Sequence, residues 1–148
     1  MKRFQFPLSG LEKVRLARVD QARLVLARSE AAKMTEEEEL MKLEGKMKGT
    51  AEKASREGVL DMTAIIEEQV YQDDLRRKRD ESRERLEQWM AQVESDRQRL
   101  MGARKEHKAL ERLRERRYLE FVQEVLRDEN IASDEAASIA DQRRRKEA

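Results

Sequence analysis

The scarcity of helix-breaking residues constrains the fold of this chain more than any other feature of its sequence. Its 148 residues include a single proline, Pro7, and five glycines. Proline is compatible with the first turn of a helix, whereas glycine weakens a helix interior. One region concentrates glycine with other turn-forming residues, and it consists of Gly45, Gly49, Thr50, Ser55 and Gly58. The sequence therefore predicts two long helices separated by one turn.

These signals also predict where the elements begin and end. We expect a first helix over about 8–54, a turn over about 55–60 and a second helix over about 61–129. Residues 130–148 are expected to form a separate short tail helix. The reason is that Ser133, followed by two acidic residues, resembles a helix cap with an acidic first turn.

Composition favours long solvated helices over a globular core. Charged residues make up 44% of the chain and hydrophobic residues 38%, which is a small apolar store for a sphere of this length. Disorder usually accompanies a large net charge, but here 33 Lys and Arg face 32 Asp and Glu, for a net charge of +1. The same balance argues against a large uniform attraction to nucleic acid or anionic membranes. The partners are therefore expected to be proteins.

A seven-residue repeat indicates that the helices pack as a coiled coil. In the second helix one row comprises Leu86, Val93, Leu100, His107, Arg114 and Phe121, and its companion row is assigned to Met90, Ala103 and Leu110. In the first helix one row comprises Val19, Leu26, Lys33, Leu40 and Met47, and another comprises Leu11, Arg18 and Val25. Acid-first pairs four residues apart support the second helix, namely Asp73–Arg77, Asp74–Lys78 and Glu81–Arg85.

Two helices joined by one turn fold back antiparallel, because each then covers the apolar stripe of the other. The predicted fold class is therefore all-α: an antiparallel two-helix coiled-coil hairpin with a long second helix and a short C-terminal tail helix. We expect it to form a single domain over 1–148. Part of the longer second helix must extend beyond the first.

The sequence lacks the groups of residues that catalysis or cofactor binding requires. His107 is the only histidine, and its heptad position predicts a polar packing residue. The run Glu36–Glu39 predicts a solvated face, because consecutive helical side chains point in different directions. The glycines match no nucleotide-binding loop, and without cysteine there is no thiolate chemistry. We expect a non-enzymatic protein with no catalytic residue, no cofactor and no metal site.

Binding to nucleic acid or insertion into a membrane is not expected. Two basic clusters, Arg76–Arg79 and Arg112–Arg117, are interleaved with acidic residues, whereas counterion release rewards uninterrupted positive faces. The apolar start Phe4–Leu11 is interrupted by polar residues and by Pro7, so it predicts neither a signal peptide nor a membrane span. We expect a cytoplasmic protein. Several side chains crowd more than one face of the second helix and predict that another surface covers them, namely Tyr118, Phe121, Val122, Val125 and Leu126.

Both ends of the chain resemble the FliJ family, the small stalk proteins of the flagellar export apparatus. The opening Phe4–Leu11, followed by Val14, Arg18, Ala22, Leu26 and Ala27, is similar to the family's Phe-x-Phe start and Ala-punctuated helix. The segment Glu111–Arg117 with Tyr118, Phe121, Glu124 and then Asp134-Glu135-Ala136 resembles its C-terminal pattern. That pattern is a leucine and basic cluster, an aromatic residue and an Asp-Glu-Ala motif. The resemblance covers nearly the whole chain.

The resemblance implies an antiparallel hairpin, similar to the central shaft of rotary ATPases, that inserts in the ring of the export ATPase FliI. It further implies partnership with the export gate protein FlhA and with export chaperones, and peripheral association with the inner-membrane export apparatus. The candidate ring-binding residues are Arg15, Arg18, Arg112, Arg116, Arg117, Phe121, Asp134 and Glu135. The candidate gate-binding residues are Tyr71, Leu75, Lys78 and Ser82, where Lys78 and Ser82 replace the aromatic or small residues of the family.

Two alternatives stay open at the level of sequence. One is the equivalent stalk of a virulence type III secretion system. The Asp134-Glu135-Ala136 motif favours the flagellar form over this alternative. The other is a generic coiled-coil scaffold without an ATPase partner, which the polar positions His107 and Arg114 permit. In a generic scaffold the terminal motifs are dispensable, whereas the stalk hypothesis requires them.

Overall fold

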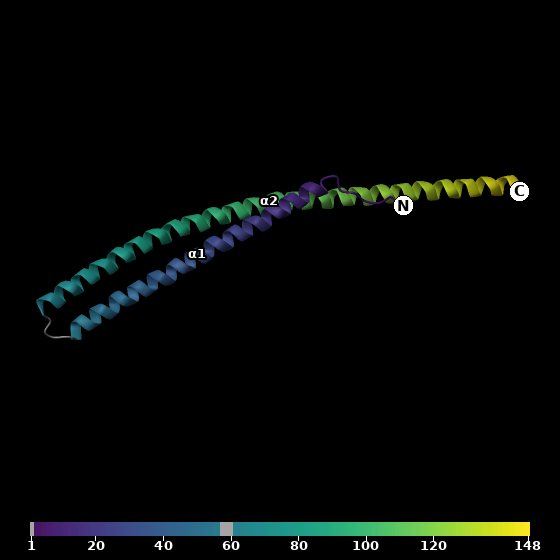
Figure 1. The fold of residues 1–148 in the computed structure, drawn as a ribbon. Helices are drawn as coiled ribbons and strands as arrows, with labels where there is room; N and C mark the ends of the chain where they lie inside the picture. The colour runs from purple at the N-terminus through teal and green to yellow at the C-terminus, as the bar shows by residue number, and fades with distance from the viewer. Residues whose placement is uncertain (1, 57–60) are drawn as a thin grey trace. The chain divides into compact units, whose positions relative to one another are not determined.

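The computed structural model of the protein describes residues 2–56 and 61–148. Over these residues it consists of two α-helices, α1 (Ser9–Arg56) and α2 (Met62–Glu147), and contains no strand (Figure 1). The all-α prediction is confirmed, and the helices begin one residue after the predicted positions 8 and 61. Of the predicted turn over 55–60, residues 57–60 lie outside the described part of the chain.

Both helices begin where local hydrogen bonding favours a start. The Ser9 amide donates to the Phe6 carbonyl at 3.1 Å, so the turn that contains Pro7 leads directly into α1. Proline fits there because the first amides of a helix lack intrahelical acceptors. The Asp61 carbonyl accepts a hydrogen bond from the Ile65 amide at 3.0 Å, which places Asp61 at the capping position of α2. Aspartate is among the residues preferred there.

The separate C-terminal tail helix was a wrong prediction. Helix α2 continues without a break through Asn130 and Ser133 to Glu147, and Figure 1 shows one unbroken ribbon there. Asn and Ser have lower helix propensity than Ala, but each costs only a fraction of a kcal/mol, and the segment contains neither proline nor glycine. The basic last turn of α2, which contains Arg144, favours a helix end by complementing the helix dipole.

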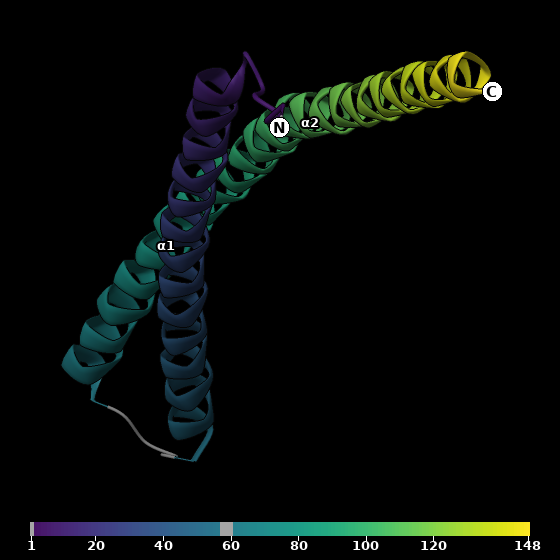
Figure 2. The ribbon, with the colours of Figure 1, turned by 90° about the vertical axis from the view of Figure 1, so that its right-hand side faces the viewer.

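The chain divides into two compact units. Unit 1 comprises Met1–Arg18 and Ala103–Ala148, and unit 2 comprises Val19–Gly102. In unit 2 the parts of α1 and α2 lie side by side and run antiparallel, as Figures 1 and 2 show. The hairpin prediction is consistent with this packing.

The strip along which the two helices of unit 2 pack, called here the seam, follows the seven-residue repeat. In α1 the predicted row is confirmed, because Val19 is buried and the other members are half-buried, namely Leu26, Lys33, Leu40 and Met47. The other predicted row of α1 was wrong in part, since Leu11 and Arg18 are exposed whereas Val25 is half-buried. Side chains at a 3–4 spacing face one strip of the partner helix, so a row at the edge of that strip is covered only in places.

In α2 the main predicted row is confirmed within unit 2, with Leu86 half-buried and Val93 and Leu100 buried. Its companion row was partly wrong, because Met90 is exposed and the neighbouring Trp89 is half-buried instead. The companion row in unit 2 consists of Leu75, Ser82, Trp89 and Asp96. A shift of one residue rotates a side chain by about 100° around a helix, which is enough to move it from the seam to solvent.

The seam contains polar residues that the apolar pattern does not reveal. Ser82 is 0% exposed and Asp96 is 1% exposed. The Asp96 Oδ1 atom accepts a hydrogen bond from Gln92 Nε2 at 3.0 Å, whereas its Oδ2 atom has no hydrogen-bond partner among the described residues. Burying a polar atom without a partner costs free energy. Asp96 therefore weakens the seam at one of its most buried positions.

Glu36 departs from the solvated face predicted for Glu36–Glu39. Its side chain is only 14% exposed, and its Oε1 atom lies 3.0 Å from Arg85 Nε. The Ser82 hydroxyl donates to the other carboxylate oxygen of Glu36 at 3.4 Å. Further pairs across the seam join Arg97 to Glu30 at 3.4 Å and Arg83 to Glu44 at 3.2 Å. Charged residues that flank an antiparallel seam thus help to set its register.

Two glycines in the interiors of the helices offer a direct test of the helical backbone there. Gly45 and Gly102 both lie inside helices, and a Cβ atom added at either meets no heavy atom within 4 Å. We expect Gly45→Ala and Gly102→Ala each to raise the free energy of unfolding by about 0.5–1 kcal/mol, because alanine loses less backbone entropy on folding. Thermal unfolding followed by circular dichroism measures the change. A destabilising substitution would contradict helical backbone at that position.

Candidate partner-binding surfaces

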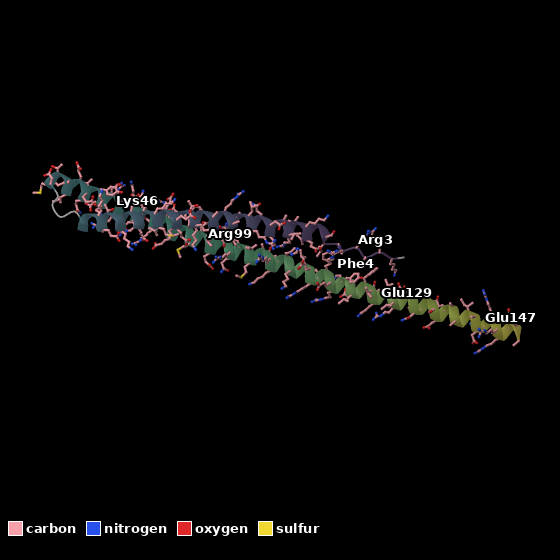
Figure 3. The ribbon with its side chains drawn as sticks, turned by 90° about the horizontal axis from the view of Figure 1, so that it is seen from below. Arg3, Phe4, Lys46, Arg99, Glu129 and Glu147 are labelled. Carbon is pink, nitrogen blue, oxygen red and sulfur yellow. The ribbon has the colours of Figure 1, made fainter. Side chains whose placement is uncertain are left out.

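The N-terminal segment of unit 1 packs against α2 through the Phe-x-Phe start. The Phe4 ring lies edge-on to Tyr118, with ring centroids 5.3 Å apart, and tilted against Phe121 at 5.6 Å. Phe6 is buried. Lys2 extends further along α2 and forms an ion pair of 2.5 Å with Asp128. Figure 3 shows Arg3 and Phe4 beside α2 on the N-terminal side of Glu129.

The start of α1 continues this packing within unit 1. Arg15 forms an ion pair with Glu106, and Arg114 lies 3.2 Å from Glu12. His107 is half-buried between these pairs, which agrees with the predicted polar packing residue. Its Nδ1 atom lies 3.7 Å from a carboxylate oxygen of Glu111, one helical turn away. The paired residues hold this part of the hairpin closed.

The candidate ring-binding residues divide into free and engaged groups. Arg18, Arg112, Arg116, Asp134 and Glu135 are exposed. Arg15 is half-buried and paired with Glu106, Arg117 lies 3.3 Å from Glu120, and Phe121 is half-buried against Phe4. Asp134 follows Arg116 by 18 residues on one helix, a rise of about 27 Å. The structure therefore does not bring the acidic pair close to the arginines.

The exposed side of α2 in unit 1 carries a basic face that includes two lysines absent from the predicted set. Lys105, Lys108, Arg112 and Arg116 are exposed at intervals of three and four residues, on the side opposite His107 and Leu110. Within the described residues, none of the four forms an ion pair. The two lysines could have been found from the sequence, because they precede Arg112 at i, i+3, i+7 spacing and so lie on the same side of the helix. We call these four residues the basic outer face.

Of the four candidate gate-binding residues in unit 2, two lie inside the seam and two lie outside it. Leu75 is 2% exposed and Ser82 is fully covered, so neither side chain is available to a partner while the hairpin is closed. Tyr71 and Lys78 are exposed. The four residues do lie on one helical face, as predicted, but half of that face packs inside the hairpin. Their contact with a gate stays a prediction.

The predicted helical charge pairs form in part. Asp74 and Lys78 pair at 2.9 Å as predicted, but Asp73 pairs with Arg76. Arg77 instead contacts Asp74 at 2.7 Å, and its other terminal nitrogen lies 3.3 Å from Glu81. Arg85 pairs with Glu36 across the seam and not with Glu81, its predicted partner on the same helix. Pairs three residues apart compete with pairs four apart, and a partner on the facing helix competes with both.

The Asp74 carboxylate provides a pH-dependent test of this network. Two hydrogen bonds lower the pKa of Asp74 below its ordinary value of 3.8; the one from Lys78 has the larger effect and the one from Arg77 the smaller. A lowered pKa in the folded state means that the pairs stabilise the protein at neutral pH, and that this stabilisation is lost as pH falls through the folded pKa. We expect Lys78→Met to raise the Asp74 pKa toward 3.8, measured by carboxyl NMR titration. Lys42→Met is the control, and an unchanged Asp74 pKa in Lys78→Met would contradict the pairing.

Two further kinds of site are absent from the part of the chain that the structure describes. There, no group of three or more His, Asp or Glu side chains is arranged to hold a metal ion. Over the same residues, neither helix has a stretch long and apolar enough to cross a membrane.

The two helices pair as a hairpin and carry charged and apolar side chains on their outer faces. Such a hairpin is typical of proteins that act by binding other proteins. The family model described as flagellar FliJ protein matches residues 4–146 of the chain. The chain therefore belongs to the FliJ family, and it is a stalk-type component of flagellar or type III protein export.

A solved structure supports the fold assignment. The putative YscO homolog CT670 from Chlamydia trachomatis is similar to this chain with a TM-score of 0.72, over 99% of this chain and 100% of that one. The two sequences are 18% identical, so the likeness concerns the fold. A search of curated protein sequences found no match.

Proposed function

We propose that this protein is the central stalk of the flagellar export apparatus, a non-enzymatic component that inserts in the FliI ATPase ring. In this role it promotes hexamer formation and ATP hydrolysis by FliI and couples them to the export gate protein FlhA and to export chaperones. It acts in the cytoplasm, peripherally associated with the inner-membrane export apparatus. Membership of the FliJ family supports the proposal and favours the flagellar form over a virulence secretion stalk or a generic scaffold.

The basic outer face is the single observation that carries the ring contact. Its four cations are exposed and form no ion pair among the described residues, so a partner can engage them without breaking contacts within the hairpin. Arg15, by contrast, is committed to Glu106 and helps to hold α1 on α2. The proposed contact therefore centres on Arg112 and Arg116, with Lys105 and Lys108 added to the predicted set. Arg15 supports that surface from within the hairpin.

A charged helical face suits a part that acts on a ring of six similar subunits. Exposed ion pairs each contribute little free energy, so contacts can exchange from one subunit to the next. A hairpin that contacts the subunits unequally changes their relative preference for the closed, nucleotide-bound state without any chemistry of its own. The coupling is reciprocal, so nucleotide binding by the ring also changes its affinity for the stalk.

The gate contact is proposed for the exposed part of the predicted face. Tyr71 and Lys78 are the members that a partner can reach in the closed hairpin, whereas Leu75 and Ser82 keep the seam closed beneath them. Lys78 is held by Asp74 at 2.9 Å, so a gate surface that engages Lys78 must compete with that pair.

Charge reversal of the basic outer face tests the proposal. We expect the double variant Arg112→Glu and Arg116→Glu to weaken binding of purified FliI at least tenfold at low salt, because two attractive contacts become repulsive. Fluorescence anisotropy of the labelled stalk measures the affinity. The matched control is Lys42→Glu with Lys46→Glu, which makes the same charge change at the same spacing on exposed positions of α1.

Three outcomes of that experiment are decisive. Weakened binding in the Arg112/Arg116 variant alone, with unchanged helicity by circular dichroism, supports the ring contact. Equal binding by the wild type and both variants contradicts it. Equal weakening in both variants also contradicts it, because binding would then depend on net charge rather than on this face.

A further inference from the structure

The last part of α2 carries an apolar stripe with the spacing of a coiled-coil seam. Tyr118, Val125, Ala132 and Ile139 lie seven residues apart, and Val122 and Ala136 belong to the row between them, which Glu129 interrupts. Repeats of this kind place the side chains on one side of a helix, ready for a second helix. Tyr118 and Ile139 are each about half-exposed, although α2 is regular over the whole stretch.

Among the described residues of unit 1, the N-terminal segment covers only the beginning of this stripe. Phe4 packs on Tyr118 and Phe121, and Lys2, which precedes it, forms an ion pair with Asp128. Every residue from 126 to 148 is exposed. A groove of about 590 Å³ begins where the covering segment ends. Its lining is mostly apolar and comprises Phe121, Val122, Val125, Leu126 and Ala132, with Lys2, Asp128 and Glu129 at its rim.

The charge around the stripe determines what can pair with it. Between Glu120 and Asp141 there are seven acidic residues and one basic residue, Arg127. A second copy of the same segment brings acid against acid along most of its length. Along this acidic stretch, anionic lipid and nucleic acid are repelled for the same reason. The charge pattern therefore selects a protein segment with basic flanks.

The N-terminal segment of the chain shows the same preference. It combines basic residues with an aromatic one, in Lys2, Arg3 and Phe4, and its Lys2 pairs with an acidic residue beside the groove. From these observations we infer that the stripe from Tyr118 to Ile139 binds an amphipathic helix of another protein, with apolar residues at heptad spacing and Lys or Arg on both flanks. We call the stripe with its acidic flanks the acidic C-terminal face. The inference does not depend on ATPase binding by the basic outer face.

Two synthetic peptides test the inference with the full-length chain. Both are 21 residues long with leucine at the two apolar heptad positions; one carries lysine and the other glutamate at the flanking positions. Fluorescence anisotropy at low salt is expected to give at least tenfold tighter binding of the lysine peptide. The double variant Leu126→Asp and Ile139→Asp is expected to lose at least tenfold in affinity for that peptide. Both side chains are half-exposed, so helicity should not change.

The control places the same substitutions on another exposed apolar pair. Met34→Asp with Met41→Asp on α1 is expected to leave peptide binding unchanged. Equal binding of the two peptides, or equal loss in both variants, overturns the inference. It is also overturned if the wild type forms a dimer in sedimentation velocity that Leu126→Asp with Ile139→Asp abolishes, because the face then binds a second copy. Binding to anionic vesicles that the same variant abolishes assigns the face to a membrane and overturns it as well.

Discussion

Replacing Leu100 with alanine is expected to lower the free energy of unfolding by about 2–3 kcal/mol. Leu100 is 6% exposed and lies in the predicted heptad row of α2. Truncation removes buried methyl groups and leaves a gap that two helices can close only in part. For a chain of this length the change corresponds to a fall in Tm of roughly 5–10 °C. Thermal and urea unfolding, followed by circular dichroism, measure the loss.

The adjacent residue provides the control for that experiment. Met101 is 49% exposed, so Met101→Ala is expected to change the free energy of unfolding by no more than about 0.5 kcal/mol. The two positions differ by one residue in sequence and by about 100° around the helix. If Met101→Ala destabilised the protein as much as Leu100→Ala, the register of the seam would be wrong.

Replacing Asp96 with leucine is expected to have a large effect of the opposite sign. The buried Asp96 carboxylate has one oxygen without a partner among the described residues, so its desolvation is poorly compensated. Leucine completes the companion row of Leu75 and Trp89 with an apolar side chain and has the higher helix propensity. We expect the free energy of unfolding to rise by about 1–3 kcal/mol. The same unfolding measurements record the change.

Asp96→Asn separates the effect of charge from that of shape. It keeps the size of the side chain and removes the charge, so we expect a smaller gain, of up to about 1 kcal/mol. A loss of stability in both Asp96→Leu and Asp96→Asn would show that the carboxylate supports the seam through a contact other than Gln92, and the account of a poorly compensated charge would fail.

The heptad repeat allowed much of the fold to be predicted because it records which residues face the partner helix. Val19, Val93 and Leu100 were assigned from spacing alone, and all three are buried. The companion row was predicted with Met90 in the place of Trp89, because both side chains are apolar and sequence carries no direct record of a one-residue rotation. Polar seam residues such as Asp96 escape any method that searches for apolar positions.

Local signals misled where they compete with helix propensity. Ser133 followed by acidic residues resembles a helix start, yet the same residues continue α2, because a capping signal does not break a helix without a proline or glycine. Glu36 appeared to belong to a solvated run, but the seam passes through its position and Ser82 donates a hydrogen bond to its carboxylate. For both Ser133 and Glu36, the neighbouring residues in the sequence predicted an environment that the structure does not have.

The sequence indicated candidate site residues, but it could not show which of them the hairpin itself engages. Sequence similarity indicated Arg112 and Arg116, and both are exposed, but it could not show that Arg15 is paired with Glu106. That pair joins residues 91 positions apart, so it depends on the register of the hairpin rather than on any local pattern. Likewise, Leu75 and Ser82 are candidate gate-binding residues by resemblance to the family, although both lie inside the seam.

The rate of ATP hydrolysis by the FliI ATPase, measured with and without this protein at low salt, tests the stalk proposal most directly. Sedimentation of the same samples reports the oligomeric state of the ATPase. The account predicts faster hydrolysis together with hexamer formation, and loss of both effects in the Arg112→Glu and Arg116→Glu variant. An unchanged rate and an unchanged oligomeric state, with the protein folded and helical, would contradict a stalk that acts on the ATPase ring.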